Sequence, residues 1–196
     1  MEYYIEVKEE DKVIYPITLT NRFEKFYHLL KDLGVEKKKV CIVSDSNVSK
    51  LYTDVICAEI SKGIKEVHTF NFSSGEKQKN LETVYSLYKK LIGLKFDRKD
   101  ILIALGGGVV GDLTGFVAAT YLRGISFIQI PTSLLAMVDS SIGGKTGVDF
   151  LGYKNMVGAF HQPTAVHINV NTLKSLAKEH FHNGMAEILK HGLIKD

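Results

Sequence analysis

The sequence predicts an α/β fold, an open and mostly parallel Rossmann-like sheet with helices on both faces, followed by the start of an α-helical C-terminal domain. Two observations predict this class. The candidate strands are short and apolar throughout, as strands of a parallel sheet covered by helices must be. They also alternate with segments whose apolar residues recur at helical spacing. With 196 residues, 45% of them hydrophobic, the chain can bury the core of one ordinary domain and part of another.

Seven strands are expected, each a short apolar run bounded by turn residues. They cover residues 3–7, 13–18, 40–43, 66–72, 101–105, 125–130 and 165–170. The first helix is expected to be capped by Asn21, and a later helix is expected to begin at Asn80. Residues 154–155 are expected to form a polar break. From residue 174 the pattern is again helical, so we expect an α/β domain at 1–173 and the start of a truncated helical domain at 174–196.

Charge and cysteine content exclude several classes of protein. The chain has 25 basic and 22 acidic residues, and its net charge of +3 is scattered, which argues against a nucleic-acid partner. Its two cysteines, Cys41 and Cys57, lack the spacing of a disulfide framework. Neither a signal peptide nor an apolar run of roughly 20 residues is visible. We therefore expect a cytoplasmic protein with no membrane partner.

Ligands of open α/β sheets bind beyond the carboxyl ends of the strands, which selects the loops at 45–47, 106–112 and 131–133. The middle loop has the Gly-x-Gly-x-x-Gly spacing of a dinucleotide fingerprint, with a strand before it and a helix after it. The acid normally found about 20 residues downstream is missing, and Asp45 lies upstream instead. The motif alone leaves two interpretations open, a pyrophosphate site with a different strand order and a tight turn.

Lys145 follows two glycines in a segment that resembles the end of a phosphate-binding P-loop. The first glycine of that motif is replaced by Asp139, so a P-loop is excluded. A nucleophile elbow around Ser141 is excluded at the same position. An anion site, a proton relay and a solvated loop lysine remain open for Lys145. His161 lies near an expected turn, and two interpretations of it remain open, a proton shuttle and a packed side chain.

Glu187, Lys190 and His191 lie near one face of the last predicted helix because they are three and four residues apart. A carboxylate and an imidazole at this spacing can share a metal ion, but a tight zinc site takes at least three protein ligands. On spacing alone, a surface ion pair is the favoured interpretation.

Together these segments resemble 3-dehydroquinate synthase, in a superfamily that also contains glycerol and iron-dependent alcohol dehydrogenases. The matching segments occur in the family's order and cover nearly the whole chain. They are residues 44–48, 75–79, 106–112, 121–124, 131–147, 154–163 and 183–190. The block from Pro131 to Gly147 is the most specific. The resemblance identifies the chain as the N-terminal half of such an enzyme, without the helical C-terminal domain.

The resemblance implies a cleft for NAD and for a phosphorylated seven-carbon sugar acid, in a homodimer. The residues implied for cofactor binding are Asp45, Asn47, Glu76, Lys79, Gly107, Gly108, Asp112, Thr132, Ser133, Leu135, Asp139, Lys145 and Lys154. The residues implied for catalysis and substrate contact are Asp139, Lys145, Asn155, Lys190 and Arg123. Of these, Arg123 would reach the phosphate of a neighbouring subunit's substrate. Glu187 is implied as one of three ligands of a zinc or cobalt ion.

The implied reaction converts 3-deoxy-D-arabino-heptulosonate 7-phosphate into 3-dehydroquinate and phosphate, a step of the shikimate pathway, with NAD regenerated in each turnover and zinc as Lewis acid. The family's two histidine ligands belong to the missing domain, so we expect this chain alone to be inactive and to hold zinc weakly. Two segments depart from the family pattern, residues 150–153 and 175–177. A related sugar-phosphate cyclase, a polyol dehydrogenase and a non-catalytic NAD-binding or dimerisation module remain alternatives.

Overall fold

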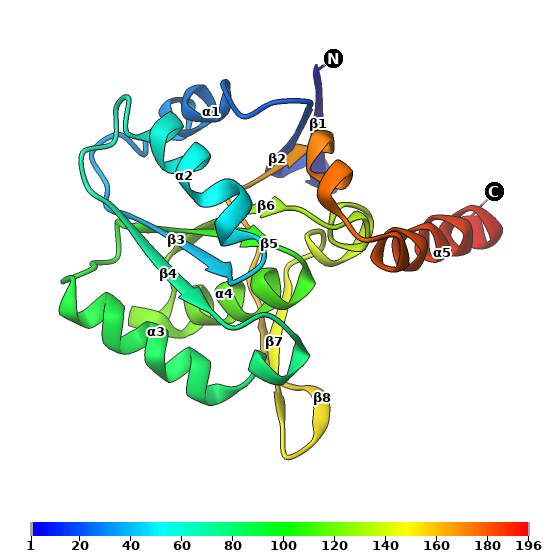
Figure 1. Ribbon diagram of the computed structural model, residues 1–196. Helices are drawn as coiled ribbons and strands as arrows, with labels where there is room; N and C mark the ends of the chain where they lie inside the picture. Colours follow the sequence, from blue (N-terminus) through cyan, green and yellow to red (C-terminus); the bar gives the residue numbers. More distant parts are fainter. Residues whose placement is uncertain (1, 196) are drawn as a thin grey trace.

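A computed structural model describes residues 2–195 and confirms the expected α/β class (Figure 1). Seven strands form one sheet in the order β1-β2-β9-β6-β5-β3-β4. They are β1 (Glu2–Glu9), β2 (Lys12–Thr20), β3 (Val40–Asp45), β4 (Val67–Phe72), β5 (Ile101–Gly106), β6 (Ser126–Pro131) and β9 (Ala165–Asn169). Strand β1 pairs antiparallel with β2, and the other neighbouring pairs are parallel. The carboxyl ends of the parallel strands therefore meet at one edge of the sheet.

Helices cover both faces of the sheet. They are α1 (Phe26–Asp32), α2 (Ser49–Ile60), α3 (Leu81–Gly93) and α4 (Gly108–Thr120), and the C-terminal α5 (Lys178–Lys195) lies beyond the sheet. Helices α1 and α2 lie on one face, and α3 and α4 lie on the other (Figure 1). In β3, Val40 and Ile42 pack under α1 and α2, whereas Cys41 and Val43 pack under α3 and α4. Because successive side chains point to opposite faces, the whole strand must be apolar.

The first helix begins later than the sequence predicts. Asn21 is not its cap, because α1 starts at Phe26 and no side chain caps it. The Asn21 carbonyl instead accepts a hydrogen bond of 2.5 Å from Asn171 Nδ2, which ties the segment after β2 to the segment after β9. The predicted start of the later helix at Asn80 is confirmed, and the structure adds that Asn80 is its cap, since its side chain accepts a hydrogen bond of 2.9 Å from the Thr83 N–H.

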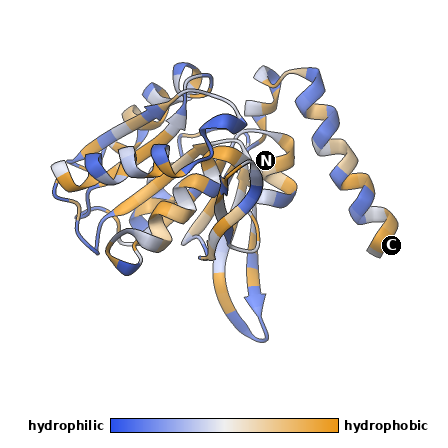
Figure 2. Ribbon diagram, turned by 90° about the horizontal axis from the view of Figure 1, so that it is seen from below, coloured by the Kyte–Doolittle hydropathy of each residue, from blue (hydrophilic) through white to orange (hydrophobic). Residues whose placement is uncertain are grey.

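Strands β7 (Lys145–Phe150) and β8 (Tyr153–Phe160) form a separate two-stranded hairpin that projects from the body (Figures 1 and 2). The sequence predicts a polar break at Lys154 and Asn155, but both residues lie in β8. Leu151 and Gly152 form the turn with φ of 50° and 83°. Two positive φ values are typical of a type I′ hairpin turn, but leucine is not a residue that signals one. The turn therefore had no recognisable sequence signature.

Helix α5 contacts the body at its start and extends away from it toward its C-terminal end (Figures 1 and 2). A Cβ added to Gly184 would lie 2.6 Å from Leu134 Cβ, so this glycine permits the close contact. Further along, Leu189, Leu193 and Ile194 are 61%, 88% and 73% exposed. Short helical turns connect the other elements, η1 (Glu76–Gln78), η2 (Tyr121–Arg123), η3 (Ala136–Ser140) and η4 (Val170–Ser175). Within residues 2–195, no helix has the length and hydropathy to cross a bilayer.

Candidate functional site

The three loops selected from the sequence lie side by side, because they follow β3, β5 and β6 and these strands are neighbours in the sheet. A cleft of about 480 Å³ opens beside them, between α4, η3 and the β7–β8 hairpin. Four residues predicted for the site line it, Asp112, Asp139, Lys145 and Asn155. The structure therefore brings together side chains that are up to 43 residues apart in the sequence, from Asp112 to Asn155.

The glycine loop leads directly from β5 into the N-terminus of α4, whose cap residue Gly107 has no capping side chain. A Cβ on Gly108 would lie 3.0 Å from Ser140 Oγ, and one on Gly107 would lie 3.4 Å from Ser133 Oγ. Ser140 Oγ is buried without a hydrogen-bond partner among the described residues. The helix N-terminus offers free N–H groups and partial positive charge. This end of α4 therefore fits an anionic pyrophosphate group.

Lys145 enters the cleft at the start of β7. Gly144 before it is left-handed, with φ of 68°, and a Cβ there would lie 2.8 Å from the Gln162 side chain. Glycine is therefore required at the turn that delivers the lysine. Across the hairpin, Lys145 is opposite Phe160, which is 85% exposed and also lines the cleft. Phe160 was not predicted, because its position facing the cleft depends on the unpredicted hairpin.

Lys79 is buried, and its ammonium group is held by two protein side chains. Nζ donates to Asp112 Oδ2 and to Asn155 Oδ1, each at 2.5 Å. The Lys79 carbonyl accepts a hydrogen bond of 2.8 Å from the Asp149 N–H. Backbone and side chain of one residue thus tie α4 to the hairpin. The structure places Lys79 beside the predicted cofactor cleft, with its charge engaged by the protein.

The two partners of Lys79 are unusual, Asp112 in the pKa of its carboxyl and Asn155 in its backbone conformation. Desolvation raises the pKa of Asp112, the nearby Lys79 opposes this effect, and the charges of Glu76 and Asp139 add to it. Asn155 has φ of 56°, a conformation that asparagine tolerates better than most residues. A carboxyl whose proton affinity is raised and an oriented amide therefore face the same cleft.

Asp45 is the last residue of β3, and its Oδ1 accepts hydrogen bonds of 2.8 and 3.0 Å from the N–H groups of Asn47 and Val48. These hydrogen bonds hold the turn that leads into α2 and use one oxygen of the carboxylate. Glu76 and Lys154 form an exposed ion pair of 3.3 Å between the loop after β4 and the hairpin. The last loop places three predicted residues at different depths, Thr132 buried, Ser133 half-buried and Leu135 exposed.

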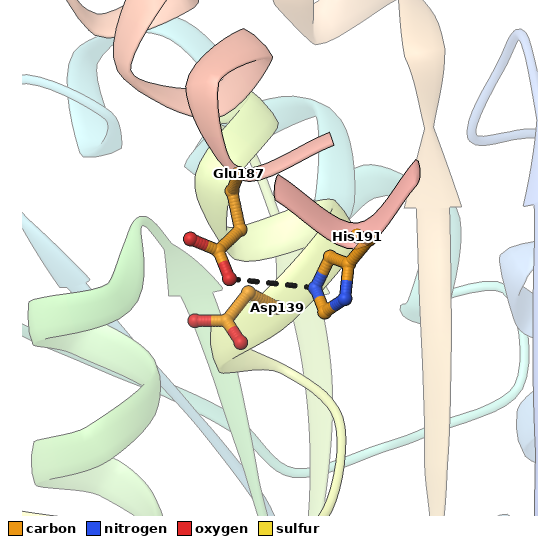
Figure 3. Close-up of side chains that lie close together, drawn as sticks. All are labelled: Asp139, Glu187 and His191. Carbon is orange, nitrogen blue, oxygen red and sulfur yellow. Dashed lines mark ion pairs between the residues drawn. The ribbon is translucent and has the colours of Figure 1, made fainter. Parts of the chain in front are cut away.

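A second group of polar side chains lies where α5 meets η3 (Figure 3). Asp139, Glu187 and His191 each offer one donor atom, and these atoms lie within 4.8 Å of one another. Glu187 Oε1 is 3.4 Å from His191 Nε2 and contacts the Lys190 ammonium. The ion pair expected from the helical spacing is therefore present. The sequence does not predict that Asp139 joins the pair, because it is 48 residues from Glu187.

Comparison with known proteins gives the family. A model described as the 3-dehydroquinate synthase N-terminal domain matches residues 69–183. The chain belongs to this family. The 3-dehydroquinate synthase of Ruminiclostridium cellulolyticum is 47% identical over the whole chain, and that of Acetivibrio thermocellus is 50% identical over 93% of it. The chain spans 54% and 50% of these relatives, about half their length.

Solved structures similar to this chain agree in fold. A 2-deoxy-scyllo-inosose synthase in complex with carbaglucose-6-phosphate, NAD⁺ and Co²⁺ matches 99% of the chain and 52% of its own length, with a TM-score of 0.90 and 27% identity. ValA, a 2-epi-5-epi-valiolone synthase from Streptomyces hygroscopicus with NAD⁺ and Zn²⁺, matches 95% of the chain and 51% of its own length, with a TM-score of 0.82 and 31% identity. A glycerol dehydrogenase from Schizosaccharomyces pombe, at 16% identity and a TM-score of 0.60, shares the fold.

Two candidates from the sequence are not among the residues that line the cleft. Arg123 is exposed in η2, the short turn that follows α4. His161 Nε2 lies 2.8 Å from the Ile125 carbonyl, and its ring stacks on Phe127 with centroids 5.5 Å apart. These contacts favour the packed side chain over the proton shuttle.

Proposed function

We propose that residues 1–173 form the NAD-binding domain of a 3-dehydroquinate synthase, and that residues 174–196 begin its metal and substrate domain. The reaction is the conversion of 3-deoxy-D-arabino-heptulosonate 7-phosphate into 3-dehydroquinate and phosphate, with phosphate eliminated as the leaving group. The observation that carries the proposal is the meeting of the glycine-capped α4 with Asp112, Asp139, Lys145 and Asn155 around one cleft. The family membership supports it.

The N-terminus of α4 would receive the pyrophosphate of NAD, with Gly107 and Gly108 as the close backbone contacts. Asp45 Oδ2 would accept a hydrogen bond from a ribose hydroxyl. The unpaired Ser140 hydroxyl and the space beside the two glycines fit such a ligand. NAD would supply reversible oxidation of a substrate alcohol, and a divalent cation would hold and polarise that alcohol. The NAD⁺ and Co²⁺ or Zn²⁺ in the related synthases support both assignments.

The proposed substrate carries two anionic groups, a phosphate and a carboxylate, and the cleft offers cationic and hydrogen-bonding side chains that could bind it. The ammonium of Lys145 would bind an anionic group, and the Asn155 amide, fixed by Lys79, would hydrogen-bond a hydroxyl. Lys190 lies at the rim on α5, in contact with Glu187. Arg123 is exposed and does not line the cleft of its own chain, so it would serve the phosphate in the cleft of a second copy, and we also propose a homodimer.

Calorimetric titration with NAD tests the cofactor assignment. The Asp45→Asn variant retains a side-chain oxygen for the turn between β3 and α2 but removes the carboxylate charge. We expect it to bind NAD about tenfold or more weakly than the wild-type chain, since hydrogen bonds to charged groups contribute about 1.5–3 kcal/mol. Asp54→Asn, an exposed aspartate on α2, is the matched control and should bind as wild type does. Equal NAD affinity of all three proteins would refute the cleft assignment.

Phosphate release tests the expectation that this chain alone is inactive. The chain would be incubated with NAD, zinc and the heptulosonate phosphate, and free phosphate would be measured against a sample without protein. We expect no release above that background, because the chain spans about half of its relatives. Clear release would show that residues 1–196 suffice for catalysis.

A further inference from the structure

The turn that delivers Lys145 into the cleft ends in two glycines. Gly143 and Gly144 are both left-handed, with φ of 87° and 68°. Successive glycines have access to many backbone conformations, so contacts from outside the turn must select the observed one. Residues 141–144 also connect η3 to β7, and these elements carry Asp139 and Lys145 into the cleft. The conformation of the turn therefore sets how these two charged side chains are placed relative to each other.

A buried tyrosine from the start of the chain holds this turn. Tyr15 lies in β2 and is 1% exposed, and its hydroxyl accepts a hydrogen bond of 3.1 Å from the Gly143 N–H. Its side chain belongs to the same buried cluster as Met137 of η3. We propose that Tyr15 is a positioning residue, which fixes the turn through the Gly143 N–H and so orients the Lys145 ammonium toward an anionic group of the substrate. The anion-binding role of Lys145 rests on the proposed function.

The other backbone hydrogen bonds of the turn join it to its immediate neighbours. The N–H groups of Ser141 and Ile142 donate to carbonyls of η3, at 3.1 and 3.0 Å. The Gly144 carbonyl accepts a hydrogen bond of 2.8 Å from the His161 N–H, directly after β8. These bonds connect the turn to η3 and to the hairpin. The Tyr15 hydroxyl instead connects it to a strand of the central sheet, which is the rigid part of the domain.

A second buried side chain supports the same turn from β6. Gln129 is 5% exposed, and its Nε2 donates a long hydrogen bond of 3.5 Å to the Ser141 carbonyl. A Cβ on Gly111 would lie 2.5 Å from Gln129 Oε1, so the third glycine of the fingerprint leaves room for this amide. Buried polar groups need hydrogen-bond partners, and Tyr15 and Gln129 both find theirs in the turn before Lys145. The sheet thus holds this turn from two strands.

Replacement of Tyr15 by phenylalanine removes the hydroxyl and keeps the ring. Amide hydrogen exchange of the 196-residue chain, followed by NMR, measures the support without a ligand. We expect the Gly143 amide to exchange at least about threefold faster, since the net loss of one hydrogen bond corresponds to a change of roughly 2–12-fold in an equilibrium constant. Tyr121→Phe is the matched control, because it removes a buried hydroxyl that donates to the Phe96 carbonyl at the same distance, 3.1 Å. It should leave the Gly143 exchange rate unchanged.

Titration of the NAD-loaded chain with the heptulosonate phosphate, also followed by NMR, measures the consequence for the site. We expect Tyr15→Phe to raise the Kd by about 3–10-fold. Lys145→Met should raise it too, and the double variant should bind no more weakly than Lys145→Met alone, because Tyr15 acts through this lysine. Tyr121→Phe should bind as wild type does. A role in stability alone would give additive losses in the double variant, or a loss in Tyr121→Phe as well.

Circular dichroism of each variant verifies its fold before these measurements. Equal Gly143 exchange in wild type and Tyr15→Phe would overturn the inference. Faster exchange with an unchanged Kd, or additive losses in the double variant, would also overturn it and leave the proposed function standing. Failure of wild type to bind the heptulosonate phosphate would refute the proposed substrate instead, and the exchange result would then decide by itself whether Tyr15 holds the turn.

Discussion

Replacement of Lys79 by methionine removes the ammonium that joins α4 to the hairpin while keeping most of the side-chain volume. Nζ contacts Asp112 Oδ2 and Asn155 Oδ1, each at 2.5 Å, and the lysine side chain is 5% exposed. In the variant, the Asp112 carboxylate would stay in its partly buried position without a cation. The Asn155 amide would lose its donor at the same time.

The expected loss of stability follows from the burial of the pair. Breaking a fully buried ion pair costs about 3–5 kcal/mol, and the 21% exposure of Asp112 places this pair at the lower end, about 3 kcal/mol. For a chain of this size each kcal/mol lowers Tm by about 2–4 °C, so Lys79→Met should melt about 6–12 °C below wild type. Lys154→Met is the matched control. Its ion pair with Glu76 is exposed and should contribute at most about 1 kcal/mol.

The penalty should depend on pH. Burial raises the pKa of Asp112 above 3.8, its value in the unfolded chain, and loss of Lys79 raises it further. Because the pKa of Asp112 is higher in the folded chain than in the unfolded chain, the folded chain binds this proton more tightly. The stability of the folded chain therefore falls as pH rises through the raised pKa. The difference between Lys79→Met and wild type should therefore be larger at pH 7 than at about pH 4.5.

Urea unfolding followed by circular dichroism at both pH values provides the measurement. The double variant Lys79→Met/Asp112→Asn should be more stable at pH 7 than the sum of the single variants predicts, because no carboxylate is stranded. Two results would refute the reasoning. One is a loss no larger than that of Lys154→Met, and the other is a loss that does not change between the two pH values.

Three further predictions concern other parts of the chain. Gly184→Ala should destabilise by about 1–3 kcal/mol, because its Cβ would lie 2.6 Å from Leu134 Cβ and 2.7 Å from the Leu135 backbone nitrogen. Gly192→Ala should instead stabilise α5 by up to about 1 kcal/mol, because a Cβ at Gly192 would have no other atom within 4 Å. Equal Tm values for the two variants in thermal unfolding would contradict this difference. Burial lowers the pKa of His167 from 6.5 to about 4, so stability should fall by roughly 3 kcal/mol in total as pH drops through this range. An NMR titration that places the His167 midpoint above pH 6 would refute it. Burial raises the pKa of Cys41 to about 12, so a thiol reagent should label the half-buried Cys57 before Cys41 in the folded chain. Mass spectrometry of the digested protein would show the order of labelling, and labelling of Cys41 first would count against the burial argument.

The sheet could be predicted because its signal is local. The residues of β3 are apolar on both faces, and turn residues bound each strand, so residues 40–43 alone indicate a covered parallel strand. The order of strands and loops then places Asp45 and the glycine loop at the carboxyl edge. The start of α3 at Asn80 could be predicted for the same reason, since the Thr83 N–H that Asn80 caps is only three positions away.

The polar contacts of the site could not be predicted, because they join residues distant in sequence. Lysine is rarely buried, and Lys79 is buried because Asp112 and Asn155 reach it from two other elements. The hairpin turn places Leu151 at a positive φ that leucine seldom adopts, so no turn residue marks it. The meeting of Asp139 with α5 depends on a helix contact that the helical period cannot reveal.

The way α5 is attached sets the order in which the helix would unfold. The helix packs on the body near Gly184, and its last turns carry the exposed Leu193 and Ile194. A helix held near one end opens first at the other, so fraying would start at the last turns and reach the Gly184 contact last. Amide hydrogen exchange should therefore be fastest around Leu193 and slowest around Gly184.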